Sequence, residues 1–188
     1  SLQPCLRVSQ RCRVLLWRQG LPWRAKGINS PSDKRRLQVA QETHSVISTL
    51  EIHPYQPEDH AQVVSLWSDV FVDDPPWNEP TAMIRRKLTV QPELFFVACI
   101  DDQVVGAVMA GFDGVRGWIY HLAVHKSYRR QGIASSLMRA AEKGLEAAGC
   151  PKVNLQVRAT NRAVIAFYRS LGYEVEERAS LGKRLEVD

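Results

Sequence analysis

The chain has 188 residues, with 25 Lys or Arg against 20 Asp or Glu and a formal net charge of +5. It contains no run of 18 apolar residues, which excludes a membrane-spanning helix. The length suits one domain plus an extension, since a part of about 140 residues can bury a core of its own.

The positive charge is concentrated at the start of the chain. Residues 1–44 hold nine Lys or Arg against Asp33 and Glu42 and show no clean periodicity. We therefore expect residues 1–46 to be a basic leader, disordered or loosely attached, followed by one domain over residues 47–188. No Met precedes Met83, so translated upstream sequence ahead of a native start such as Val46 is one interpretation. A transit peptide and an arm for RNA, the ribosome or an acidic membrane surface are the others.

The four cysteines are Cys5, Cys12, Cys99 and Cys150. Their spacing matches neither a metal site nor a disulfide framework, so no metal is expected. Cys99 lies in an apolar run, where a buried free thiol is typical. We predict a reducing compartment and a cytoplasmic location.

Hydrophobic periodicity and turn residues divide the domain into alternating strands and helices. The pattern predicts, in order, a strand over residues 49–55, a helix beginning at Pro57, a helix from Pro80 to about residue 90, a hairpin of strands 94–100 and 104–111, a strand over 118–124, a helix over 132–148, a strand over 153–158, a helix over 161–171 and two closing strands. This order indicates an α+β fold, with a mixed sheet and helices on both faces.

A short basic loop joins the strand over 118–124 to the long helix. The first N–H groups of a helix lack partners, and the helix dipole presents positive charge there, so this position suits an anion. Gly132 and Ala134 leave room for a phosphate group, while Arg129 and Arg130 add charge and Ser135 adds a hydroxyl donor. Alone, this motif more often marks a simple turn.

A second strand and helix follow about thirty residues later, in residues 153–158 and 161–173. With both motifs present, the chain from about Thr49 to Val187 resembles the GNAT superfamily of acyl-CoA-dependent N-acetyltransferases. It looks most like the YpeA-like bacterial branch, close to the ribosomal-protein alanine acetyltransferases, in residues 76–78, 111–117, 149–152 and 180–185. The resemblance implies the three-layer GNAT fold, an α+β arrangement with a mixed, mostly antiparallel central sheet.

The resemblance also implies acetyl-CoA as co-substrate. The positions that would bind its pyrophosphate are Arg129, Arg130, Gln131, Gly132, Ile133, Ala134 and Ser135. The backbone of Leu122, Ala123 and Val124 would pair with the pantetheine arm, and Asn161 would contact the same arm. Two other interpretations stay open, because Asn161 is also a suitable N-cap and Leu122 and Val124 also suit the core.

Tyr168 matches the general acid of the family, which protonates the departing thiolate. An aromatic core residue beside Phe167 is the alternative. The ribosomal-protein enzymes have a glutamate base where this chain has Gln156, and an amide cannot accept the proton. His121 and Glu79 are therefore the candidate bases, although His121 is equally typical of a strand histidine with a structural partner.

Asp73, Asp74 and Glu79 crowd the loop between the first two helices, where the family shapes its acceptor site. This charge favours a cationic acceptor, although a solvated loop is the alternative. The resulting hypothesis is an N-acetyltransferase that acts on a primary amine, such as a protein N-terminus, a lysine or a small polyamine, by direct attack in a ternary complex. The rival hypothesis is a non-catalytic acyl-CoA sensor. Exposed edge strands of such sheets often pair, so a homodimer is possible. Nucleic-acid binding is expected only if the leader is native.

Overall fold

The computed structural model describes residues 49–185, so the predicted leader lies outside the described residues. The longer elements are β1 (Leu50–Pro54), α2 (His60–Val70), α3 (Pro80–Leu88), β2 (Phe95–Ile100), β3 (Gln103–Phe112), β4 (Gly117–Val124), α4 (Ile133–Ala147), β5 (Val153–Asn154) and α5 (Arg162–Ser170). The short 3-10 helices are η1 (Pro57–Asp59), η2 (Pro76–Asn78), η3 (Pro92–Leu94) and η4 (Lys126–Tyr128). The predicted order of elements is confirmed from the first strand to the helix that ends at Ser170.

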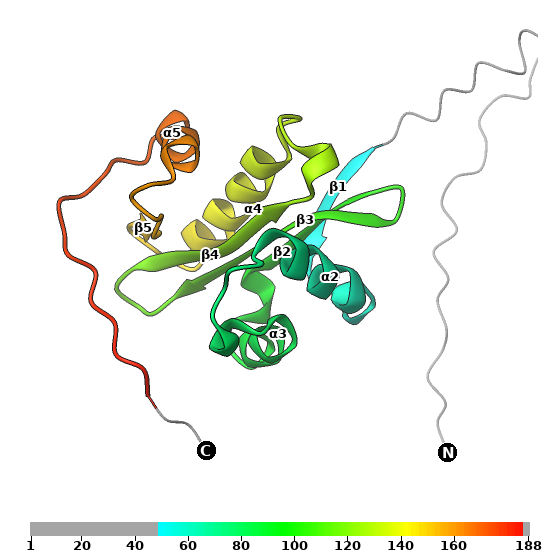
Figure 1. Cartoon of the computed structure of the whole chain (residues 1–188), viewed down its shortest axis with the longest axis horizontal. Helices are drawn as coiled ribbons and strands as arrows, with labels where there is room; N and C mark the ends of the chain where they lie inside the picture. Colours follow the sequence, from blue (N-terminus) through cyan, green and yellow to red (C-terminus); the bar gives the residue numbers. More distant parts are fainter. Residues whose placement is uncertain (1–48, 186–188) are drawn as a thin grey trace, which may run out of the picture. The chain divides into compact units, whose positions relative to one another are not determined.

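The five strands form one sheet in the order β1-β2-β3-β4-β5 (Figure 1). The pairs from β1 to β4 are antiparallel, as the short connection between β2 and β3 requires. β5 pairs with β4 in parallel, only at Gly117 with Val153 and Trp118 with Asn154. The sheet is therefore mixed and mostly antiparallel, as predicted.

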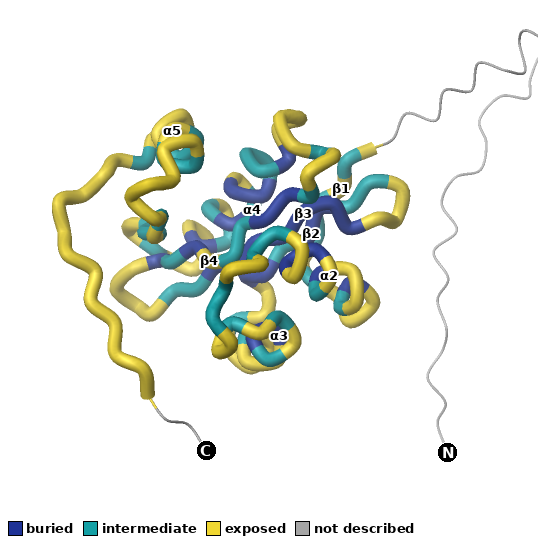
Figure 2. Tube along the Cα trace, viewed as in Figure 1, coloured by how far each residue is buried: buried dark blue, intermediate teal, exposed yellow. Residues whose placement is uncertain are grey.

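Helices cover both faces of the sheet, with α4 on one side and α2 and α3 on the other (Figure 1). Residues 107–110 of β3 alternate between the two cores: Val108 and Ala110 join the cluster under α4, while Ala107 and Met109 join the cluster under α2. Figure 2 shows the result as buried strands between partly exposed helices. A strand buried on both faces reads as a continuous apolar run, which is the pattern of residues 104–110.

Two glycines let α4 lie close to the sheet. A Cβ at Gly106 would come within 2.9 Å of Leu137 Cδ1, and one at Gly144 within 2.8 Å of Leu94 Cδ2. Both distances are shorter than carbon atoms tolerate, so Leu137 of α4 occupies the space beside Gly106 and Leu94 of η3 occupies the space beside Gly144.

The last part of the domain differs from the prediction. The strand expected over residues 153–158 is confined to Val153–Asn154, and the two closing strands are not found among residues 174–185. Instead that segment is exposed, with Leu181 93% accessible. It is tied back by an ion pair between Lys152 and Glu176 and by the Gln156 amide, which donates to Ser180 Oγ at 2.6 Å. Residues 174–178 carry four charged side chains and little alternating apolar surface, so pairing there would bury little.

None of the helices among residues 49–185 combines the length and the apolar character that a membrane crossing needs.

Candidate active site

A β-bulge in β4 sets the position of His121. Tyr120 pairs with Met109 and Ala123 pairs with Ala107, so Val108 alone faces two residues of β4. His121 takes up the extra residue with a left-handed backbone, at φ 49°. Bulges of this kind re-aim a side chain and are frequent beside active sites.

The bulge turns the imidazole toward α2. Ile119 belongs to the cluster under α4, and strict alternation would place His121 on that face too. Instead the His121 ring lies 5.5 Å from the Trp67 ring and 4.9 Å from the Phe71 ring, measured between centroids. Trp67 of α2 and Phe71, the residue that caps its C-terminus, thus fix the orientation of the ring.

Asp74 holds the other end of the imidazole. His121 Nε2 lies 3.0 Å from Asp74 Oδ2, and both side chains are largely buried, at 14% and 24% accessible. The Asn78 amide donates to the same oxygen at 3.2 Å, so the carboxylate itself is positioned. The sequence had suggested Asp74 only as acceptor-site charge. Its pairing with a histidine 47 residues away has no local signal.

His121 and Asp74 line a cavity of about 260 Å³ between α2 and the loop that leads into α3. Its walls include Trp67, Phe71 and Pro75, so it is mainly apolar with one carboxylate–imidazole pair. Trp77 does not line this cavity: its ring is 55% accessible and lies under the Arg184 guanidinium at 5.2 Å.

Glu79 also lines the cavity, but its carboxylate has a structural task. It is the N-cap of α3: Oε1 accepts from Thr81 N–H at 2.9 Å and Oε2 from Ala82 N–H at 2.7 Å. These backbone donors lower the pKa of Glu79. A carboxylate stabilised in its charged form is a weak base, so the geometry disfavours Glu79 and favours His121.

The predicted phosphate cradle lies between η4 and α4. Gly132 is the N-cap of α4 with φ 81°, no side chain caps the helix, and a Cβ added at Gly132 would meet nothing within 4 Å. Ile133 is buried and anchors the first turn, while Ala134 and Ser135 are only partly covered. An open, uncapped helix start is what a pyrophosphate group requires, so the residues fit this part of coenzyme A.

Two side chains of the same loop are held by backbone carbonyls. Arg129 Nε donates to Val124 O at 3.1 Å, and Gln131 Nε2 donates to Ser127 O at 3.4 Å. Arg129 thereby ties the loop to the end of β4, whereas Arg130 has a left-handed backbone, at φ 64°. Both residues bring positive charge to the loop that precedes α4.

The edge of β4 that faces β5 is available beyond Trp118. Within residues 49–185, no strand pairs with this edge from Ile119 to Val124. Ala123 and Val124 are buried, Leu122 packs against the cluster under α4, and their backbone continues directly into the cradle. A linear chain with amide groups could pair with this edge as a strand would.

Tyr168 lies on α5 and lines a groove of about 1450 Å³ formed with β5 and residues 173–180. Its ring contacts Phe167 at 5.1 Å and Tyr173 at 5.6 Å between centroids. Burial raises the pKa of Tyr168 to about 12. Asn161 caps α5, because its Oδ1 accepts from Val164 N–H at 3.3 Å, so the N-cap interpretation is confirmed.

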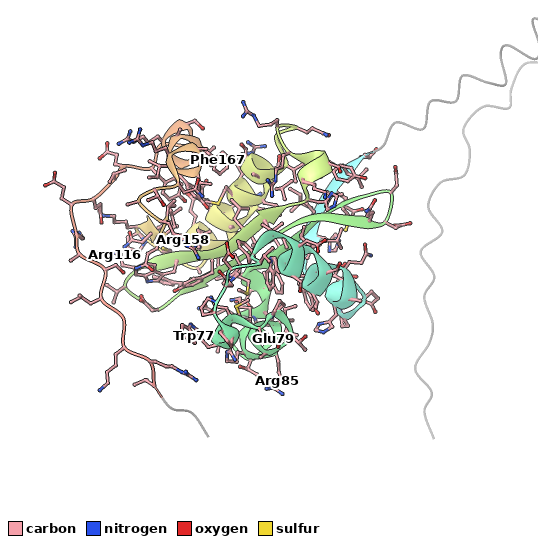
Figure 3. The ribbon with its side chains drawn as sticks, in the orientation of Figure 1. Trp77, Glu79, Arg85, Arg116, Arg158 and Phe167 are labelled. Atoms are coloured by element: carbon pink, nitrogen blue, oxygen red, sulfur yellow. The ribbon has the colours of Figure 1, made fainter. Side chains whose placement is uncertain are left out.

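The predicted residues are thus distributed over two hollows and a loop. His121 and Glu79 line the cavity beside α2 and α3, whereas Tyr168 lines the groove beside α5. Figure 3 shows the separation, with Glu79 and Trp77 beside α3 and Phe167 on the opposite side of the sheet. β4 contributes to both hollows, through His121 and Trp118.

Comparison with known proteins identifies the family. Residues 63–173, more than half of the chain, match the model of the acetyltransferase (GNAT) family. The chain belongs to this family. It is 47% identical over 139 residues to an acetyltransferase of Yersinia pestis, covering 74% of this chain and 98% of the relative. An acetyltransferase of Sodalis glossinidius is 46% identical over 140 residues, with the same shares covered. The chain is therefore an N-acetyltransferase, and its closeness to the ribosomal-protein alanine enzymes stays a prediction.

Solved structures of GNAT proteins have the same fold. Ard1 from Thermoplasma volcanium superposes with a TM-score of 0.62 at 25% identity, covering 68% of this chain and 84% of that one. The aminoglycoside acetyltransferase AAC(6')-Iy, in complex with a bisubstrate analogue of coenzyme A and acetylneamine, has a TM-score of 0.63 at 18% identity, covering 73% and 99%.

Proposed function

We propose that the chain transfers an acetyl group from acetyl-CoA to a primary amine by direct attack in a ternary complex. The observation that carries the proposal is His121, which the β4 bulge directs into the acceptor cavity while the neighbouring edge of the same strand stays available for the cofactor. The candidate base and the edge that would bind the cofactor then belong to the same strand.

The chain offers two contacts for coenzyme A. Gly132, Ile133 and Ala134 would present backbone N–H groups to the pyrophosphate, with Arg130 supplying charge. The free edge of β4 from Leu122 to Val124 would pair with the pantetheine arm. When bound, the cofactor supplies an acetyl group activated as a thioester.

His121 would accept the proton of the amine. Imidazole exchanges protons near neutral pH, and an adjacent carboxylate stabilises the imidazolium that results. Asp74 lies 3.0 Å from Nε2 and is held by Asn78, so it would both orient the ring and balance its charge. With Nε2 facing Asp74, Nδ1 is the nitrogen left to act on the amine.

Tyr168 would assist departure of the sulfur. A thiol has an ordinary pKa of about 8.5, well below the value of about 12 for Tyr168. Complete proton transfer to the thiolate is therefore uphill, and Tyr168 would act mainly as a hydrogen-bond donor to the developing negative charge. Because its pKa is raised, the hydroxyl keeps its proton throughout the physiological range.

The acceptor that suits the cavity is a cationic amine with an aliphatic stem. Trp67, Phe71 and Pro75 offer apolar and π surfaces, and Asp74 supplies negative charge. A volume of about 260 Å³ fits the end of a chain rather than a bulky ring system. A lysine side chain, a polyamine or a protein N-terminus has this shape and charge.

The test is release of the coenzyme A thiol from acetyl-CoA with a panel of peptides, polyamines and amino acids. We expect acceptor-dependent release that falls steeply in His121→Gln and in Tyr168→Phe. Tyr55→Phe is the matched control, because Tyr55 lines neither hollow. If the chain binds acetyl-CoA tightly but releases no coenzyme A thiol with any acceptor of the panel, the sensor hypothesis is favoured instead.

A further inference from the structure

A second cluster of reactive side chains lies at the start of the domain, away from both hollows. His53 of β1 and Cys99 of β2 lie on the same face of adjacent antiparallel strands, since His53 pairs with Val97, two residues before Cys99. Asp59, at the end of η1, comes from the turn that follows β1. The ligating atoms of the three residues all lie within 4.8 Å of one another.

The contacts of His53 leave one ring nitrogen for a ligand. Its Nδ1 lies 2.9 Å from Pro54 O, and because a carbonyl only accepts, Nδ1 carries the proton. Nε2 therefore presents its lone pair toward Cys99 Sγ, 3.5 Å away. A histidine that donates one N–H to a backbone carbonyl and directs the other nitrogen to a thiol has the arrangement of a metal ligand.

The spacing fits a tetrahedral ion. With a metal–sulfur distance near 2.3 Å and a metal–nitrogen distance near 2.0 Å, tetrahedral ligands lie about 3.5 Å apart. His53 Nε2 and Cys99 Sγ already have this separation. A carboxylate oxygen of Asp59 lies within 4.8 Å of a ring nitrogen of His53 and of Cys99 Sγ. Asp59 Oδ2 accepts from Gln56 N–H at 2.8 Å, so the carboxylate is also held in place.

Burial and charge favour a cation between these residues. Asp59 is the one charged residue among 49–185 that is classed as buried, at 8% accessible. The charges of Glu51 and Asp102 act on Cys99 together with that of Asp59, so the local field is negative. The His53 side chain is 20% accessible, which gives an ion a path of entry.

We propose that His53, Asp59 and Cys99 bind one zinc-class divalent ion, with a fourth position left for water. A thiolate, an imidazole and a carboxylate select Zn²⁺ or Co²⁺ over Mg²⁺ or Ca²⁺. The ion joins β1, β2 and the turn into α2, so its effect is on the stability of this corner. The cysteine spacing did not predict it, because each ligand comes from a different element.

The test uses Co²⁺ as a probe, because a Co²⁺–thiolate bond absorbs in the near ultraviolet. The full chain carries three further cysteines, so the parent is the variant Cys5→Ser/Cys12→Ser/Cys150→Ser, in which Cys99 is the remaining thiol. We expect absorption that saturates at one equivalent of Co²⁺ and disappears when Zn²⁺ displaces the Co²⁺. We also expect Zn²⁺ to raise the unfolding temperature.

Single substitutions in this parent assign the ligands. Cys99→Ser should abolish the absorption, and His53→Gln and Asp59→Asn should each weaken Co²⁺ binding roughly tenfold or more. His60→Gln is the control, since His60 bonds to the Tyr55 hydroxyl and lies outside the cluster. Absence of the absorption, or equal Co²⁺ affinity in His53→Gln and the parent, would overturn the proposal.

A second measurement needs no substitution. Zn²⁺ should slow alkylation of Cys99 in the unaltered chain, as followed by peptide mass spectrometry, while Cys150 is alkylated at an unchanged rate. Equal alkylation of Cys99 with and without Zn²⁺ contradicts the site. Neither result depends on acetyl transfer, because the three ligands line neither the acceptor cavity nor the groove of Tyr168.

Discussion

Asp74 and His121 are joined by a 3.0 Å contact between a carboxylate oxygen and Nε2, although 47 residues separate them in the chain. The pair connects the loop after α2 to the centre of β4. It therefore links the wall of the acceptor cavity to β4, whose edge opposite β3 is free for the cofactor beyond Trp118.

Replacing Asp74 tests whether it acts through the imidazole. In Asp74→Asn the amide keeps the shape but loses the charge that balances an imidazolium, so we expect kcat to fall roughly tenfold or more. KM for a cationic acceptor should rise as well, whereas KM for acetyl-CoA should not change. Asp69→Asn, an exposed neighbour on α2, is the matched control. Steady-state kinetics with both substrates varied gives the comparison, and an unchanged kcat would rule out the positioning role.

Removing the Tyr168 hydroxyl has a defined pH signature. Because burial raises its pKa to about 12, Tyr168 stays protonated well above neutral pH. We expect Tyr168→Phe to lower kcat about 100-fold, and the ratio of wild-type to variant kcat should be constant from about pH 6 to 10. A ratio that collapses toward one near pH 10 would show that Tyr168 ionises at its ordinary pKa.

The two ends of α4 provide a matched test of the cradle. Gly132 and Gly149 have φ values of 81° and 80°, and a Cβ at either would meet nothing within 4 Å. Alanine at each position should lower the free energy of unfolding by about 1 kcal/mol, because left-handed backbone strains a side chain. Only Gly132→Ala should raise KM for acetyl-CoA, roughly tenfold, since its methyl group stands at the anion site. Equal KM values in the two variants would count against the cradle.

Lys87 on α3 predicts a pH dependence of stability. Burial lowers the pKa of Lys87 to about 8, from an ordinary value of 10.5, with Glu93 partly opposing the shift. Below pH 8 the amine is charged in both the folded and unfolded states, and burial of the charge costs stability. Between pH 8 and 10.5 the unfolded state binds more protons, so stability rises with pH, and above 10.5 the cost is gone.

Lys87→Met isolates this contribution from other titrations. At pH 7 the variant should be more stable than wild type by about 1 kcal/mol, a value reduced for solvent screening at a half-buried site. The difference should shrink as the pH rises from 8 through 10.5, because Lys87 is neutral in both states only above that range. Chemical denaturation at several pH values measures it. A difference that does not vary with pH would mean that Lys87 titrates normally.

The sequence predicted the fold well wherever one local pattern determined the outcome. Pro80 marked the start of α3, Asn161 marked the start of α5, and the apolar run over residues 104–110 fits a strand buried on both faces. Turn residues gave the β2–β3 hairpin to within two residues. Such features depend on neighbours in the chain, so a single sequence contains them.

The missed features depend on contacts between distant segments. The pairing of Asp74 with His121 and that of His53 with Cys99 join residues 46 or more positions apart. Glu79 had seemed a possible base because its charge was visible, but its capping of Thr81 and Ala82 was not. The sequence pattern predicts two closing strands after the last helix, whereas the charged segment 174–185 is exposed and contains no strand.

The extra residue in β4 also makes the imidazole at position 121 independent of the packing of the rest of the strand. Before the bulge Ile119 packs under α4, and after it Leu122 and Val124 pack there, so the strand changes phase at His121. Deleting His121 would restore simple alternation and leave Leu122, Ala123 and Val124 on their present faces, because Ile119 and Leu122 would then be two positions apart. Substitution and deletion at His121 should therefore both remove the imidazole from the cavity, while the core faces of β4 and its approach to the cofactor loop are kept.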